Sequence, residues 1–128
     1  MKKFRFVVER TRTGYSAYVA DERYGIYTVG GDMKELRANM LEALNLYFEE
    51  EGKVYTQENI KVVLDLAQFF EFYKVINAKA LSERIGMNQS LLAQYIKGIK
   101  TPSDAQVNRI LVGIRELGKE LSQMDIKV

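Results

Sequence analysis

Residues 85–102 read IGMNQSLLAQYIKGIKTP, and this stretch decides the fold of the C-terminal half. Gly86 follows a run with helical spacing, and glycine is common where a helix ends in a left-handed turn. Asn88 is of a type that caps helix N-termini. The residues after it keep a helical pattern until Gly98. The stretch therefore predicts two helices that are joined by about two residues.

So short a connection forces the two helices to cross sharply, as they do in a helix-turn-helix. We expect one side of the pair to pack inward through Leu81, Ser82, Ile85, Met87, Leu91, Leu92 and either Tyr95 or Ile96. The outward side of the second helix then carries Gln89, Ser90, Ala93, Gln94 and Lys97.

The chemistry of this outward side suits DNA. Glutamine can form two hydrogen bonds with an adenine edge, serine can bond to either kind of edge, and lysine reaches guanine or phosphate. The side has no carboxylate, which the DNA backbone would repel. The pattern alone leaves a second interpretation open, namely a plain helical bundle with a polar surface.

Helical patterns extend on both sides of this stretch, from Asp65 almost to the C-terminus. Asp65, Asn77 and Ser103 are placed to cap the helices that follow them. The last helix has an apolar stripe formed by Val107, Ile110, Leu111, Ile114, Leu117 and Leu121. We expect the end of this long stripe to contribute to a dimer contact. Gly113 and Gly118 interrupt the helix, and either close approach of another backbone or a packed bundle core would explain them.

The first thirty residues show the period of two that is typical of strands. Phe4, Phe6 and Val8 share one face, and two further strands are predicted at 15–20 and 26–30. Asp32, with Glu35 in the capping-box position, begins a helix that ends in EEEG, residues 49–52. A fourth strand at 60–66 completes a β-β-β-α-β unit, which has a thin core and would gain from pairing with another copy or a partner.

Composition narrows the function. The 128 residues include no cysteine and no histidine, which removes thiol chemistry and the commonest general base and metal ligand. We therefore expect no enzyme, no metal site and no cofactor. No apolar run is long enough to span a membrane. Because the chain has no cysteine, we expect a cytoplasmic protein. Residues 1–73 carry ten basic and twelve acidic residues, a balance of −2, and residues 74–128 carry nine and five, a balance of +4. The basic half is a mild pointer to nucleic acid.

The segment SERIGMNQSLLAQYIKGIKTPS, residues 82–103, resembles the helix-turn-helix of Cro and phage-repressor-type (Xre) regulators. That family usually has alanine at the place of Ser82 and a charged residue at the place of Ile96, and both changes are compatible with the fold. The resemblance implies DNA binding. The residues that we expect to contact DNA are Asn88, Gln89, Ser90, Gln94, Lys97, Lys100 and Thr101.

The segment YSAYVADERYGIYTVGGDMKELRANMLEALNLYFEEEG, residues 15–52, is similar to the core of the HicB antitoxins. The family slots are filled by Gly31, Asp32, Glu35, Glu42, Ala43, Leu44, Leu46 and Tyr47, whereas residues 22–26 replace the usual L-P-G-C. The resemblance implies a partial ribonuclease-H-like fold, a small basic ribonuclease toxin (HicA-like) as partner, and repression of the operon that encodes both. Catalysis is not expected, because the early acids lie at a strand end, in a loop and at a helix cap rather than together.

The sequence thus predicts an α+β protein with an antitoxin core at 1–65 and a DNA-binding domain at 66–128. The N-terminal half has the acidic balance that suits a basic toxin, and its tyrosines cannot all be buried in so thin a sheet. We expect the toxin to contact Tyr18, Asp21, Glu22, Tyr24 and Tyr27. We also expect the chain to bind operator DNA as a homodimer or higher even oligomer. The alternative is a stand-alone regulator whose N-terminal domain dimerises or senses a ligand; a nuclease is the third and least favoured.

Overall fold

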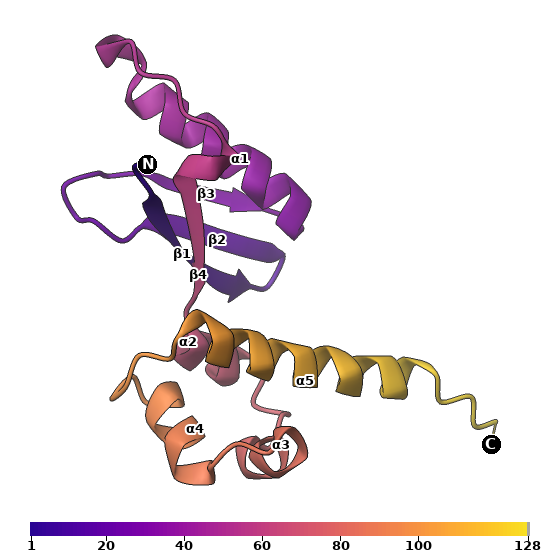
Figure 1. Ribbon diagram of the computed structural model, residues 1–128. Coiled ribbons are helices and arrows are strands. Elements are labelled where there is room, and N and C mark those ends of the chain that lie inside the picture. The colour runs from indigo at the N-terminus through magenta and orange to yellow at the C-terminus, as the bar shows by residue number, and fades with distance from the viewer. Residues whose placement is uncertain (128) are drawn as a thin grey trace. The chain divides into compact units, whose positions relative to one another are not determined.

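The computed structural model describes residues 1–127 and has two compact units, Met1–Phe72 and Tyr73–Val128. A mixed four-stranded sheet with one helix comes first, and a helical region of four helices follows (Figure 1). The prediction of an α+β protein with strands first and helices afterwards is confirmed.

The sheet has the strand order β3-β2-β1-β4. The three predicted strands, β1 (Phe4–Thr11), β2 (Gly14–Val19) and β3 (Tyr27–Gly30), are present and form an antiparallel meander. The fourth strand, β4 (Ile60–Leu64), pairs with β1 in parallel and is shorter than predicted.

Helix α1 (Met33–Tyr47) begins at Asp32, whose Oδ1 accepts a hydrogen bond from the Glu35 amide at 2.8 Å. The prediction that this helix continues to Gly52 is wrong. It ends at Tyr47, because Phe48 leaves helical geometry and turns its ring into the core. Residues Glu49–Glu51 form a separate 3₁₀ turn that Gly52 closes with a φ of 68°.

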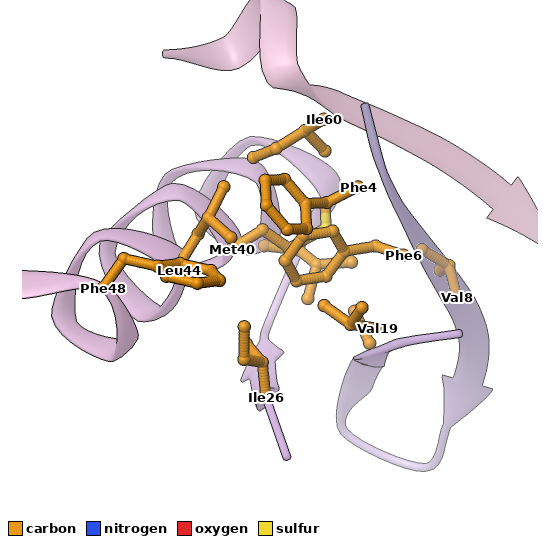
Figure 2. Close-up of a cluster of buried hydrophobic side chains, with 11 residues drawn as sticks. Phe4, Phe6, Val8, Val19, Ile26, Met40, Leu44, Phe48 and Ile60 are labelled. Carbon is orange, nitrogen blue, oxygen red and sulfur yellow. The ribbon is translucent and has the colours of Figure 1, made fainter. Parts of the chain in front are cut away.

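The core of the first unit lies between α1 and one face of the sheet, called here the inner face. Figure 2 shows Phe4, Phe6 and Val8 of β1 turned toward Met40 and Leu44 of α1. Alternation along each strand and helical spacing along α1 bring these apolar side chains together. The faces predicted from the period of two are confirmed for β1.

Helix α2 (Leu66–Phe72) lies in the first unit. The Gln68 side chain accepts from the Arg10 amide at 2.8 Å and donates to the Arg10 carbonyl at 2.7 Å, so it satisfies the main chain of β1 beyond the end of β4. The compact unit therefore extends seven residues beyond the boundary placed after residue 65 from the sequence.

The second unit contains α3 (Ala78–Ile85), α4 (Gln89–Ile96) and α5 (Asp104–Ser122). The predicted caps are confirmed: Asn77 accepts from the amide of Ala80, and Ser103 accepts from that of Gln106. No helix within residues 1–127 is long and apolar enough to cross a membrane.

Candidate nucleic-acid interface

The turn between α3 and α4 is built from local hydrogen bonds. Gly86 has a φ of 67°, and its amide donates to the Glu83 carbonyl at 3.2 Å. The Met87 amide donates to the Ser82 carbonyl at 2.9 Å, which completes the motif in which a left-handed glycine satisfies the last carbonyls of a helix. Met87 is buried beneath the turn, and Asn88 Oδ1 accepts from the Leu91 amide at 3.1 Å to start α4. The predicted pair of helices joined by a tight turn is confirmed.

Arg109 of α5 holds the same turn from the other side. Its guanidinium donates to the Ile85 carbonyl at 3.2 Å and to the Gly86 carbonyl at 2.7 Å. A cation at the C-terminal end of α3 is also favoured by the helix dipole. Sequence reasoning missed this residue, because a side chain more than twenty positions away gives no local signal at the turn.

The packing of α5 on α3 depends on a small residue. A Cβ atom at Gly113 would overlap Cγ2 of Ile85 and lie 3.8 Å from Cδ1 of Leu81, so the two helices approach closely there. Beside this contact Ser82 is buried, and its hydroxyl donates to the Lys79 carbonyl at 2.6 Å. Of the two explanations offered for the glycines of the last helix, core packing within the unit accounts for Gly113.

The predicted DNA-contacting residues lie on the outward side of α4 and in the loop after it. Six are exposed and Gln94 is partly buried: the exposed ones are Asn88, Gln89, Ser90, Lys97, Lys100 and Thr101. Leu92 and Tyr95 are buried on the opposite side of α4, as predicted. The Gln94 carbonyl accepts from the amides of Ile99 and Lys100 at 2.9 and 3.3 Å, which folds the loop back against the end of α4.

A hollow of about 210 Å³ lies between the start of α3 and α4. It is lined by Ala78, Lys79, Gln89, Leu92, Ala93, Ile96 and Lys97. Lys79 was not among the predicted residues, although it places a second ammonium group beside Gln89. No local sequence signal marks it, because the turn at Gly86 fixes the end of α3 near α4 and not its first turn. Among the residues described, the lining of this hollow includes no carboxylate.

The five predicted toxin-contacting residues fall in two places. Asp21, Glu22 and Tyr24 belong to the loop between β2 and β3. The Arg23 guanidinium donates to the Asp21 carboxylate at 2.6 Å, and this hydrogen-bonded pair lowers the pKa of Asp21 to about 2. Glu22 is exposed, so it is the loop carboxylate that is better placed to meet a partner.

Tyr24 is half-buried in an aromatic cluster rather than displayed on the surface. Its ring lies edge-on to Phe4, Tyr47 and Phe48, with centroid distances of 5.8, 5.8 and 5.4 Å. Tyr18 and Tyr27, by contrast, lie side by side on β2 and β3, on the face of the sheet opposite the inner face, called here the outer face.

Residues 1–127 contain no group of three or more histidine, cysteine or acidic side chains that could hold a metal ion.

No known protein family, curated protein or solved structure matches the chain.

Proposed function

We propose that the protein is an antitoxin of the HicB type that represses its own operon. In this proposal the second unit binds operator DNA through a Xre-type helix-turn-helix, and the first unit, a partial ribonuclease-H-like domain, masks a small ribonuclease toxin. The observation that carries the DNA-binding half is the outward side of α4, which is polar, cationic and rigidly presented by the turn at Gly86.

The geometry supports α4 as a recognition helix. An α-helix with its side chains is about 10–12 Å across, which suits the width of the major groove, and the eight residues of α4 extend about 12 Å along it. Gln89 and Ser90 are exposed in its first turn, where recognition helices commonly contact base edges. Lys79 and Lys97 line the same hollow as Gln89, so phosphates beside a base that Gln89 contacts would be within their reach.

Binding as a dimer follows from the size of this surface. One helix-turn-helix reads only a few base pairs, and two half-sites about 34 Å apart supply useful specificity.

The toxin-binding half is supported by the resemblance to HicB and by the surface of the first unit. Such toxins bind RNA and are therefore basic, and the exposed Glu22 offers a carboxylate to them. The aromatic cluster beneath the loop gives that surface a rigid base. A nuclease is not proposed, since Asp32 caps α1 and Asp21 pairs with Arg23.

The alternative is a stand-alone transcriptional regulator whose first unit dimerises or senses a ligand. One observation favours dimerisation: Tyr27 and Val29 expose 65% and 52% of their surface on the outer face of the sheet. In both readings the second unit binds DNA.

The test of DNA binding compares base-reading and phosphate-binding residues. Gln89→Ala should weaken binding to the DNA upstream of the gene that encodes this protein by about 1–3 kcal/mol, and binding to random DNA should change little. Lys97→Ala should weaken binding to both and reduce the salt slope by about one. Asn108→Ala, an exposed polar change on α5, is the control. Equal losses on operator and random DNA for Gln89→Ala would remove the base-reading role.

The masking role is tested by co-expressing the chain with short neighbouring genes that encode basic proteins. We expect the full chain to rescue growth and to co-purify with one of them. A fragment should extend to Phe72 rather than residue 65, because the Gln68 side chain satisfies the main chain of β1. Rescue by residues 73–128 but not by residues 1–72 would contradict the assignment.

A further inference from the structure

A row of apolar and aromatic side chains crosses the outer face of the sheet. The strand register places Val63 of β4 beside Val7 of β1, Val7 beside Tyr18 of β2, and Tyr18 beside Tyr27 of β3. The row therefore spans all four strands. Tyr18 and Tyr27 are 39% and 65% exposed. A continuous row of this kind marks an interaction surface more often than scattered exposed residues do.

Charged residues border this row with opposite signs and equal spacing. Arg5 lies two residues before Val7 and Glu9 lies two residues after it, and alternation puts all three on the outer face. On the adjacent β4, Lys61 pairs with Arg5, and Asp65 follows the last residue of the strand, where its carboxylate accepts a hydrogen bond from the Gln68 amide. The row thus has a basic border toward one end of the strands and an acidic border toward the other.

The acidic border acts on Tyr18. Burial raises the pKa of Tyr18 above its ordinary value, and the nearby carboxylates of Glu9 and Asp65 raise it further. Within residues 1–127, no salt bridge satisfies the side chain of Arg5 or Glu9. Arg5 and Glu9 are therefore the border residues that are available to a partner of complementary charge.

We infer that the outer face binds the outer face of a second copy of this chain, with a two-fold axis lying along the apolar row. Such an axis reverses the direction of the strands in the second copy. The apolar row then packs on itself, and Arg5 of each copy lies opposite Glu9 of the other, as an isologous interface requires. An axis parallel to the strands would place basic on basic and acidic on acidic, and like charges in direct opposition are unfavourable.

The size of the face sets the strength of this contact. Four strands about 4.8 Å apart and five residues long cover roughly 300 Å² per copy, which is small for a protein interface. We therefore expect a dimer that dissociates in the micromolar range. The balanced charges of the borders favour a second copy over a uniformly basic toxin. Tyr18 and Tyr27 then belong to the dimer, and the toxin surface keeps Asp21, Glu22 and Tyr24.

The inference deepens the dimer of the proposed function and is tested on the full chain without DNA. Sedimentation equilibrium measures the dimer dissociation constant of the wild type, Arg5→Glu and Glu9→Arg. Each variant places like charges at both symmetric contacts, so each should raise the constant about tenfold. An equimolar mixture of the two variants should associate as tightly as the wild type, because the acidic border of one then faces the basic border of the other. Arg37→Glu, on the exposed side of α1, makes the same charge change off this face and should have no effect.

Recovery in the mixture also shows that both variants are folded. Unchanged association of either variant, or failure of the mixture to recover, overturns the inference. If all variants form equally tight dimers, the protein is a dimer but its interface is not the outer face. If the wild type is monomeric at every concentration, the dimer itself is refuted, whereas the Gln89→Ala comparison still decides on DNA binding. If Arg5→Glu loses toxin binding and self-associates like the wild type, the outer face binds the toxin and not a second copy.

Discussion

Gly113→Ala and Gly118→Ala are the same change in the same helix, and we expect them to alter the stability of the second unit in opposite directions. Both remove an interior glycine from α5, which by itself favours the helix by about 1 kcal/mol. At Gly118 no other atom lies within 4 Å of the position that a Cβ would take, so this gain should be kept. The expected result is a stabilisation of about 0.5–1 kcal/mol.

At Gly113 the same methyl group has no room. Its Cβ would overlap Cγ2 of Ile85, and a β-branched side chain in a helix has essentially one χ1 position and cannot swing away. Overpacking of this kind costs about 1–3 kcal/mol. After the gain in helix propensity is subtracted, the net loss should be about 1 kcal/mol and at most about 2 kcal/mol.

Urea unfolding followed by far-UV circular dichroism measures these changes, since the chain has no tryptophan to serve as a fluorescent probe. The midpoint should rise for Gly118→Ala and fall for Gly113→Ala at an unchanged slope. Ile85→Leu removes the branch methyl and should lower the cost of Gly113→Ala measured in that background. Midpoints that rise equally for both glycine variants would show that α5 does not press on α3 at this point.

Two further predictions follow from single side chains. Arg109→Ala removes two hydrogen bonds to the carbonyls of Ile85 and Gly86 and should destabilise the second unit by about 1 kcal/mol, as measured by urea unfolding. It should also weaken operator binding, as measured by titration with DNA. Unchanged stability and binding would mean that the turn at Gly86 does not depend on Arg109. In an NMR titration the Asp21 carboxylate should have a midpoint near 2, and in Arg23→Ala it should return toward its ordinary value of 3.8. The stability that this pair contributes is present above about pH 4 and is lost as the pH falls toward 2, because the folded pKa lies below the unfolded one.

The features that the sequence predicted well are local ones. Asn88 and Ser103 cap their helices through bonds that span three residues, and Gly86 closes a turn within its own neighbourhood. The period of two on β1 predicted its buried face for the same reason, since alternation is a property of the strand itself. The outward stripe of α4 was predicted because helical spacing alone fixes which residues share a side.

The features that the sequence did not predict depend on distant contacts. Arg109 meets a turn more than twenty residues away, and Lys79 joins the candidate site only because α3 lies across α4. Gln68 ties α2 to β1 across a separation of 58 residues, so a boundary drawn from periodicity fell before that helix. Tyr24 resembled a surface residue by composition, yet Phe4 at the start of the chain draws it into an aromatic cluster.

In the proposed recognition of DNA, α3 and α5 fix the orientation of α4. Helix α4 is joined to α3 by the turn at Gly86, and Arg109 of α5 donates hydrogen bonds to that turn while α5 packs closely on α3 at Gly113. A base contact by Gln89 requires that the orientation of α4 be fixed before DNA arrives, since an unfixed helix would lose affinity in being ordered. Arg109→Ala and Gly113→Ala, which alter the contacts of α5 with α3 and its turn, should therefore weaken operator binding more than random binding, because only base readout depends on the angle of α4. Phosphate contacts by flexible lysines would tolerate a small rotation, whereas a paired amide on a base edge would not.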